Sequence, residues 1–272
     1  MTALQDWGAA LRAWTIPQAI LEAAPESPYG FPPELFARRA EAAASQTETP
    51  TTRAALEVLP DQGQVLDVGV GGGATSIPLA GRAGKIVGVD GSAELLTSFR
   101  NAAADAGVRS ETALGTWPES ADAVAPADVV VCGHVLYNVW DLAPFVRALD
   151  DHARRRVVLE LTDRHPWAWM HDLWRTFHGL ARPEGPTADD CVAALGELGI
   201  EPARDQRPQE GAGWFERRED AVALMRRRLC LPAERDPDVA AALGDRLVDH
   251  DGLWSAGPPE GVVVTLWWDR TA

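Results

Sequence analysis

The sequence predicts an α/β fold in which a mostly parallel sheet carries helices on both faces. Between residues 64 and 162, short apolar runs alternate with stretches of helical periodicity, a pattern typical of parallel sheets. The first apolar run leads directly into a glycine-rich turn, which holds Gly69, Gly71, Gly72 and Gly73. Glycine lets a ligand approach the backbone closely, so this stretch indicates the first unit of a nucleotide-binding fold.

The elements of the sheet follow from the same alternation. Strands are expected at 64–68, 85–90, 110–114, 127–134 and 155–162, with helices at 74–80, 93–106 and 142–152. The helix at 74–80 would direct its free N–H groups toward a ligand at the glycine turn.

Helical segments are expected before and after this half of the chain. Leu4, Trp7, Leu11 and Trp14 share one helical face, and further N-terminal helices are expected at 16–24, 33–44 and 51–59. On the C-terminal side, a stripe of Trp167, Met170, Trp174 and Phe177 predicts a helix within 166–180. The remaining elements are helices at 185–199, 214–231 and 236–249, a weak strand at 200–207, and a strand at 262–268 that should join the sheet edge antiparallel.

Composition limits the partners of the chain. A formal net charge of −15 and a pI near 4.8 argue against a general nucleic-acid or membrane-surface binder. The run Arg226–Arg228 is a candidate basic patch, but we prefer to interpret it as a solvated helix face. The cysteines Cys132, Cys191 and Cys230 are far apart and predict neither a disulfide framework nor a zinc site. With no signal peptide or long apolar stretch, we expect a cytoplasmic protein.

A glycine-rich turn alone does not identify a cofactor, because NAD, FAD and S-adenosylmethionine folds all use one. Here the glycines follow a D-x-G-x-G-x-G pattern, with Asp67 inside the first strand and Ala74 where a dinucleotide motif has its last glycine. Asp90 ends the second strand, where a carboxylate accepts hydrogen bonds from both ribose hydroxyls and would repel the 2′-phosphate of NADP. These features favour S-adenosylmethionine.

Four motifs, in this order, resemble the class I S-adenosylmethionine-dependent methyltransferases, and the bacterial small-molecule type in particular. They are VLDVGVGGG (65–73), IVGVDGSAELL (86–96), ALGTWPE (113–119) and ADVVVCGHVLYNV (127–139). The strand at 262–268 fits the family's antiparallel seventh strand. The resemblance implies a Rossmann-like, seven-stranded, mostly parallel sheet with an antiparallel last strand and helical lid segments. It also implies a single domain over 1–272, with an N-terminal helical lid at 1–50, a cofactor-binding half at 51–165, and lid helices and closing strands at 166–272.

The same resemblance implies which residues hold S-adenosylmethionine and its product S-adenosylhomocysteine. They are Asp67, Gly69, Gly71, Gly73, Asp90, Gly91, Ser92, Gly115, Thr116, Trp117, Cys132, Gly133 and His134. Many family members have an acidic residue near Thr116 that accepts from the adenine amino group, so here Thr116 would replace it or Trp117 would stack on the ring. No metal is expected, because metal-dependent members need a carboxylate at the end of strand four and residues 132–134 supply none.

Methyl transfer from a sulfonium depends mainly on positioning, and a general base is needed only for a hydroxyl or a protonated amine. His134 is the first candidate base, and His165, with Asp163 to orient it or acting alone, is the second. A histidine that packs on the cofactor or bonds to the backbone is the alternative at each position. The candidates for contact with the substrate are Tyr137, Asn138, Trp167, His171 and Trp174.

We therefore expect methyl transfer to oxygen or nitrogen of a small metabolite. Ten of the 11 tryptophans lie outside 50–130, so the acceptor pocket would be aromatic-lined, unless these rings serve only as packing anchors. The alternatives are an S-adenosylmethionine-binding protein without methylation, a protein or tRNA methyltransferase, and a NAD-dependent oxidoreductase. The sequence leaves open whether the chain forms a homodimer.

Overall fold

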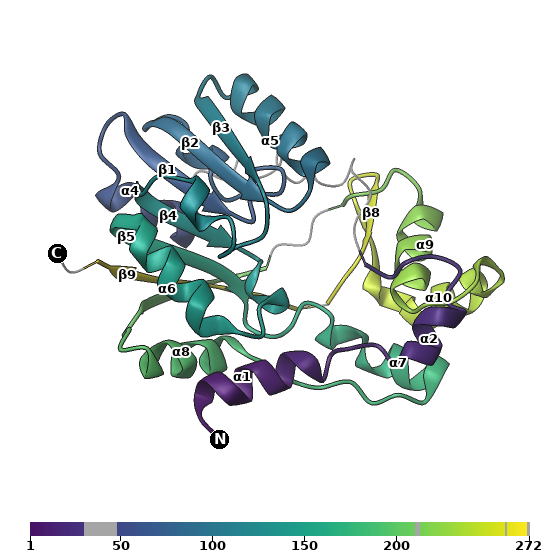
Figure 1. Ribbon diagram of the computed structural model, residues 1–272. Helices are drawn as coiled ribbons and strands as arrows, with labels where there is room; N and C mark the ends of the chain where they lie inside the picture. The colour runs from purple at the N-terminus through teal and green to yellow at the C-terminus, as the bar shows by residue number, and fades with distance from the viewer. Residues whose placement is uncertain (30–47, 210–212, 259, 271–272) are drawn as a thin grey trace.

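A seven-stranded sheet forms the centre of the structure, a computed structural model that describes residues 1–29, 48–209, 213–258 and 260–270 (Figure 1). The strand order is β3-β2-β1-β4-β5-β9-β6. The strands are β1 (Gly63–Val68), β2 (Ala83–Asp90), β3 (Arg109–Leu114), β4 (Ala127–Gly133), β5 (Ala153–Thr162), β6 (Ala203–Pro208) and β9 (Val262–Asp269). Strand β9 is antiparallel to β5 and β6, and the other neighbouring pairs are parallel. The predicted fold class is confirmed.

Helices cover both faces of the sheet (Figure 1). On one face, α4 (Pro50–Val58) and α5 (Ala93–Asp105) bury Ala55 and Phe99 against the strands. On the other face lie α1 (Ala3–Arg12), α6 (Leu142–His152) and α8 (Ala188–Glu197), whose apolar residues share a second core with the sheet. Thr187 caps α8 together with Asp190, as its sequence indicates.

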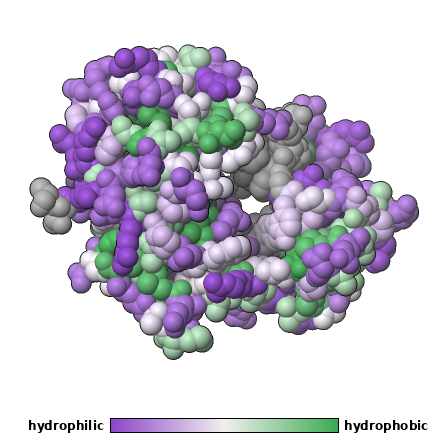
Figure 2. Space-filling view, in the orientation of Figure 1, coloured by the Kyte–Doolittle hydropathy of each residue, from purple (hydrophilic) through white to green (hydrophobic). Residues whose placement is uncertain are grey.

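A third apolar core lies beside the sheet and forms what we call the lid. It consists of α2 (Gln18–Ala23), α7 (His171–His178), α9 (Arg218–Arg228), α10 (Asp236–Leu243) and the hairpin β7 (Leu247–His250)–β8 (Leu253–Ala256). Ile16, Trp174 and Met225 are buried at its centre. Figure 2 shows a hollow between the sheet and the lid helices. Within the described residues, none of the helices is both long and apolar enough to cross a membrane.

The prediction of a helix at 74–80 is wrong. After the glycine turn the chain makes only further turns and the short 3-10 helix η1 (Ile77–Leu79). Pro78 lacks an N–H donor and disfavours the helical conformation of the residue before it, so an α-helix cannot extend through this position. The glycine turn is therefore held by the glycines and by β2, where Val89 O accepts from Gly69 and Val70, rather than by a following helix.

Strand β9 lies inside the sheet rather than at its edge. Val263, Val264 and Leu266 are all buried, as is usual for a strand covered on both faces. The edge position belongs to β6, whose sequence ARDQRP is polar and mostly exposed. Edge exposure thus explains why β6 has only a weak strand pattern.

Several other helix boundaries differ from the sequence-based expectation. Helix α9 begins only at Arg218, α2 is shorter than 16–24, and the helix expected at 33–44 lies outside the described residues. The helix expected at 236–249 ends at Leu243, and 247–250 forms a strand instead. That strand turns through Asp251 and Gly252, both at positive φ, which is the geometry of a tight Asp-Gly hairpin.

Candidate functional site

The turn after β1 uses backbone conformations that only glycine adopts readily. Gly69, Gly71 and Gly73 have φ of 73°, 52° and 91°. A Cβ on Gly69 would overlap the side chain of Val135, which follows β4. Glycine at this position therefore allows the turn to lie directly against the end of β4.

Asp67 lies beneath this turn as a buried carboxyl group. It is 1% exposed, and neither of its carboxylate oxygens has a hydrogen-bond partner among the described residues. Burial raises the pKa of Asp67 to about 7; the hydroxyl of nearby Ser76 opposes the shift, and the charge of Asp90 adds to it. An unpartnered buried carboxylate of this kind fits a cationic ligand group.

Asp90, at the end of β2, connects two turns. Its Oδ2 accepts a hydrogen bond from the backbone N–H of Gly71 (2.9 Å), and its Oδ1 accepts one from Ser92 (2.9 Å). The Ser92 side chain in turn caps α5 by accepting from Leu95 N–H. Each carboxylate oxygen of Asp90 can accept a further hydrogen bond, so ribose hydroxyls remain acceptable partners.

The segment after β3 lies beside the end of β2. Gly115 donates its N–H to the carbonyl of Asp90 (3.0 Å), and a Cβ on Gly91 would lie 3.9 Å from Thr116. Thr116 donates to the carboxylate of Glu119 (3.0 Å), an exposed acidic residue that the sequence reasoning missed.

Trp117 points away from this edge of the sheet. Its indole is buried in the core under α6, and its N–H donates to Phe145 O (3.3 Å). The structure therefore does not bring its ring beside Gly91 and Thr116, where we expected an adenine contact.

The end of β4 lies against the glycine turn. Cys132 is buried, and burial together with the charge of Asp67 raises the pKa of its thiol. A Cβ on Gly133 would overlap the hydroxyl of Thr75, and Val135 faces Gly69. His134 lies between these two contacts, so it stands next to the turn.

Gly133→Ala should lower the stability of the protein. Overpacking of this kind costs about 1–3 kcal/mol, which chemical denaturation would measure. Thr75→Gly should relieve the overlap, so the double variant should recover much of the loss. Gly196→Ala in α8 is the matched control, because a Cβ there meets no atom within 4 Å. Equal losses in both alanine variants would contradict this account.

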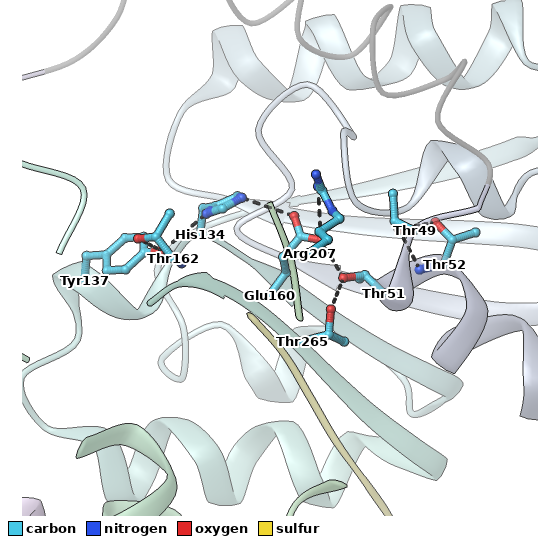
Figure 3. Close-up of polar contacts among 9 residues, drawn as sticks. All are labelled: Thr49, Thr51, Thr52, His134, Tyr137, Glu160, Thr162, Arg207 and Thr265. Carbon is cyan, nitrogen blue, oxygen red and sulfur yellow. Dashed lines mark hydrogen bonds and ion pairs between the residues drawn. The ribbon is translucent and has the colours of Figure 1, made fainter. Parts of the chain in front are cut away.

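The ring of His134 contacts the carboxylate of Glu160 of β5 (Figure 3). Its Nε2 lies 3.1 Å from Glu160 Oε1, and the His134 side chain is 45% exposed whereas Glu160 is only 12% exposed. His134 has a φ of 58°, an uncommon conformation for a residue other than glycine and one found often at functional sites. The exposed ring and its buried partner resemble the base and orienting carboxylate of an acid–base pair.

Glu160 is held by several elements at once (Figure 3). Thr51 of α4 donates to its Oε2 (2.5 Å) and also bonds Thr265 of β9 (2.7 Å), while Arg207 of β6 lies 3.9 Å away. Burial tends to raise the pKa of Glu160, but His134, Thr51 and Arg207 outweigh it and lower the pKa to about 2. Glu160 is therefore a fixed negative charge, and sequence reasoning missed it, although it is the one acidic residue in the apolar run of β5.

Tyr137 lies on the other side of His134. Its hydroxyl is 3.3 Å from His134 Nδ1 and 2.8 Å from the Thr162 hydroxyl, and it accepts the N–H of Thr162. Burial raises the pKa of Tyr137, so the phenol stays protonated and rigidly held.

His165 belongs to an aromatic cluster instead of this pair. Its ring stacks on Trp14 (3.9 Å between centroids) and meets Tyr137 and Trp167 edge-on. Burial, and then the charge of Arg182, lower the pKa of His165 to about 3. Its Nδ1 accepts the Trp167 N–H, which occupies the lone pair that a base would use.

The other predicted site residues are dispersed. The carboxylate of Asp163 lies 3.7 Å from Arg204 and forms no described contact with His165. Trp174 is fully buried in the lid core, whereas Trp167 is half-buried beside His165. Asn138 lies in the turn after β4, and His171 begins α7. In the ranges that the structure describes, no three His, Cys, Asp or Glu residues are grouped to hold a metal ion.

Comparison with known proteins gives one family and two partial relatives. Residues 65–155 match a family described as a methyltransferase domain. The ubiquinone biosynthesis O-methyltransferase of Azorhizobium caulinodans is 39% identical over 84 residues, and that of Sodalis glossinidius is 37% identical over 109. These alignments cover 31% and 39% of this chain and 33% and 44% of the relatives, so the chain spans less than half the length of either relative.

The fold itself is shared more widely. A crystal structure of a Bacillus halodurans protein described as a methyltransferase superposes with a TM-score of 0.54. The match covers 82% of this chain and 97% of that one, at 15% identity. This similarity shows that most of the chain shares the fold of that protein.

Proposed function

We propose that this chain, which belongs to the class I S-adenosylmethionine-dependent methyltransferases through its residues 65–155, transfers a methyl group to a small molecule. The observation that carries the proposal is the meeting of two features at the carboxyl ends of the parallel strands. Gly69 of the glycine turn lies against Val135, Thr75 just after the turn lies against Gly133, and the His134–Glu160 pair projects from the same edge. Open parallel sheets bind ligands at this edge.

The residues present fit S-adenosylmethionine. Asp67 would face its cationic part, because it is a buried carboxyl group without a partner. Asp90 would hold the ribose, and Gly91, Thr116 and Glu119 would lie near the adenine. When bound, S-adenosylmethionine supplies an electrophilic methyl group.

His134 is the residue that would take a proton from the acceptor. Its Nε2–H would donate to Glu160, and the acceptor hydroxyl would replace the Tyr137 hydroxyl, which lies 3.3 Å from Nδ1, as the partner of the Nδ1 lone pair. The imidazolium formed in this way is stabilised by the negative charge of Glu160. A hydroxyl acceptor needs such a base, and the names of the two relatives, O-methyltransferases, also favour oxygen over nitrogen.

The acceptor is an apolar or aromatic small molecule in this proposal. Half-buried Trp167 and half-exposed Tyr29, which stack at 6.1 Å, supply aromatic surface between the His134 edge and the lid. Trp14 is buried between His165 and Arg182 and supports this surface from behind. Such rings bind flat apolar groups and exclude water.

Calorimetric titration and a product assay test the proposed function. S-adenosylmethionine should bind and NAD should not, and incubation with metabolite pools should release S-adenosylhomocysteine. Binding of NAD alone would contradict the proposal. Binding of S-adenosylmethionine without product would indicate a non-catalytic binder, and product formed only with tRNA or protein would overturn the small-molecule acceptor.

Asp90→Ala should lower the affinity for S-adenosylmethionine about 10- to 100-fold, because it removes charged hydrogen bonds to the ribose and to the turn. Asp128→Ala is the matched control. Asp128 also accepts a backbone hydrogen bond, from Gln64 at 2.8 Å, but at the opposite end of the strands. Calorimetry on both variants decides the matter, and an unchanged affinity in Asp90→Ala would show that the ribose is held elsewhere.

A further inference from the structure

Arg182 carries a buried positive charge that no carboxylate in the described ranges neutralises. It is 4% exposed. Two other buried arginines each have two acidic partners: Arg156 pairs with Glu57 and Asp269, and Arg226 with Glu26 and Asp236. Because a buried charge without a counter-charge is unfavourable, Arg182 needs a separate explanation.

Among the residues that the structure describes, the groups around Arg182 are polar or aromatic but uncharged. Its guanidinium lies over the rings of Trp14 (5.1 Å) and Trp174 (4.9 Å). Its terminal nitrogens donate to the carbonyls of Trp14 and Thr15, and its buried Nε–H has no partner within the described part of the chain. The site is thus built for a cation and has an unused donor.

Arg182 lies beside the aromatic cluster described above. Trp14, which it covers, stacks on His165, and Trp167 links His165 to Tyr29 through ring contacts. The charge of Arg182 also acts on two members of the cluster. Burial lowers the pKa of His165 and the charge of Arg182 lowers it further, whereas burial raises the pKa of Tyr29 and the charge of Arg182 opposes that rise. Arg182 is therefore close to the surfaces assigned to the acceptor.

We propose that the acceptor carries an anionic oxygen group, a carboxylate or a phosphate, which binds Arg182 while its ring lies against the aromatic cluster. This inference rests on the proposed function, because it names the substrate class of the same site. An anion would supply the missing counter-charge and accept from Nε–H. A chain of net charge −15 repels anions in general, so an anionic acceptor requires a local cation of this kind.

Matched acid and neutral probes test the proposal. The affinity of the wild-type protein for aromatic hydroxy acids, para-hydroxybenzoate first, is compared by tryptophan fluorescence with that for the corresponding amides, and phenyl phosphate is compared with phenol. The acids or the phosphate should bind about 10- to 100-fold more tightly than their neutral counterparts. Equal binding of every acid and its neutral counterpart would overturn the proposal.

Variants of Arg182 distinguish the effect of its charge from the effect of its packing on tryptophan. Arg182→Met should abolish the preference for anions, and Arg182→Lys should keep part of it. Arg246→Met is the matched control, because Arg246 also lies over a lid tryptophan, Trp169 (5.7 Å), but is neutralised by Asp172 at 2.8 and 2.9 Å. A preference that survives in Arg182→Met, or that is lost equally in Arg246→Met, would contradict the inference.

Two further measurements keep the outcome decisive. Circular dichroism checks folding, and if Arg182→Met unfolds, the comparison rests on Arg182→Lys and the wild-type probe pairs. S-adenosylmethionine affinity is measured on the same samples. Loss of that binding with the anion preference intact would refute the proposed function alone, and the reverse pattern would refute the anionic acceptor alone.

Discussion

Replacing His134 with asparagine should lower kcat for a hydroxyl acceptor by about 10²- to 10⁴-fold, the range expected on loss of a general base. Asparagine tolerates the left-handed backbone that this position requires, so the turn should remain intact. The affinity for S-adenosylmethionine should change little, because the ring of His134 faces Glu160 and Tyr137. Steady-state kinetics and calorimetry on the same variant measure both quantities.

Acceptor acidity supplies the control for this prediction. A base matters less as the acceptor hydroxyl becomes more acidic, so the deficit of His134→Asn should shrink along a series of increasingly acidic phenols. Glu160→Gln should show a smaller deficit with the same trend, since it keeps the imidazole and removes only its charged partner. A deficit that is constant along the series would show that His134 positions the acceptor without taking its proton.

The glycine turn and the two carboxylates beside it could be predicted because their signals are local. Gly69, Gly71 and Gly73 are each required by a single turn, and Asp67 and Asp90 stand at fixed positions on neighbouring strands. Sequence periodicity indicates such features directly, because the strand, the turn and the next strand follow one another along the chain. Pro78 is also a local signal. It disfavours an α-helix through 74–80, and the prediction of a helix there did not take it into account.

The missed features depend on partners far apart in the chain. Glu160 matters because Thr51, His134 and Arg207 converge on it from three other elements. Arg226, expected on a solvated face, is buried, because Glu26, 200 residues away, neutralises it. No local pattern records such a pairing, because a charged residue has the same sequence signature whether it meets water or a distant carboxylate.

The position of β9 follows the same logic. The apolar run of β9 predicted a strand, but it did not predict which strands would pair with it. The edge of the sheet is formed by the polar strand β6, whose sequence has little strand pattern of its own. Trp117 likewise has the sequence position of an adenine contact, yet its indole is drawn into the core under α6. Burial of a large ring in the core outweighs what its place in a motif suggests.

Asp67→Asn should raise the free energy of unfolding at pH 8 and remove part of its pH dependence. The pKa of Asp67 is about 7 in the folded protein, well above its ordinary value of 3.8, so the folded state binds this proton more tightly. Stability from this group is therefore present below pH 4 and is lost as the pH rises through 7. The loss amounts to about 4 kcal/mol at most. Chemical denaturation of both proteins at pH 5 and pH 8 measures the difference.

Cofactor binding should show the opposite dependence. A cationic ligand favours the ionised carboxylate, so S-adenosylmethionine should bind the wild type more tightly at pH 8 than at pH 6 and should release a proton on binding near pH 6. Calorimetry in two buffers of different ionisation enthalpy detects that proton, and Asp67→Asn should not release it. Asp128→Asn, an acid at the far end of the strands, should behave as wild type. If Asp67→Asn still released the proton, another group would face the cation, and the unpartnered carboxylate beneath the glycine turn would have only a structural role.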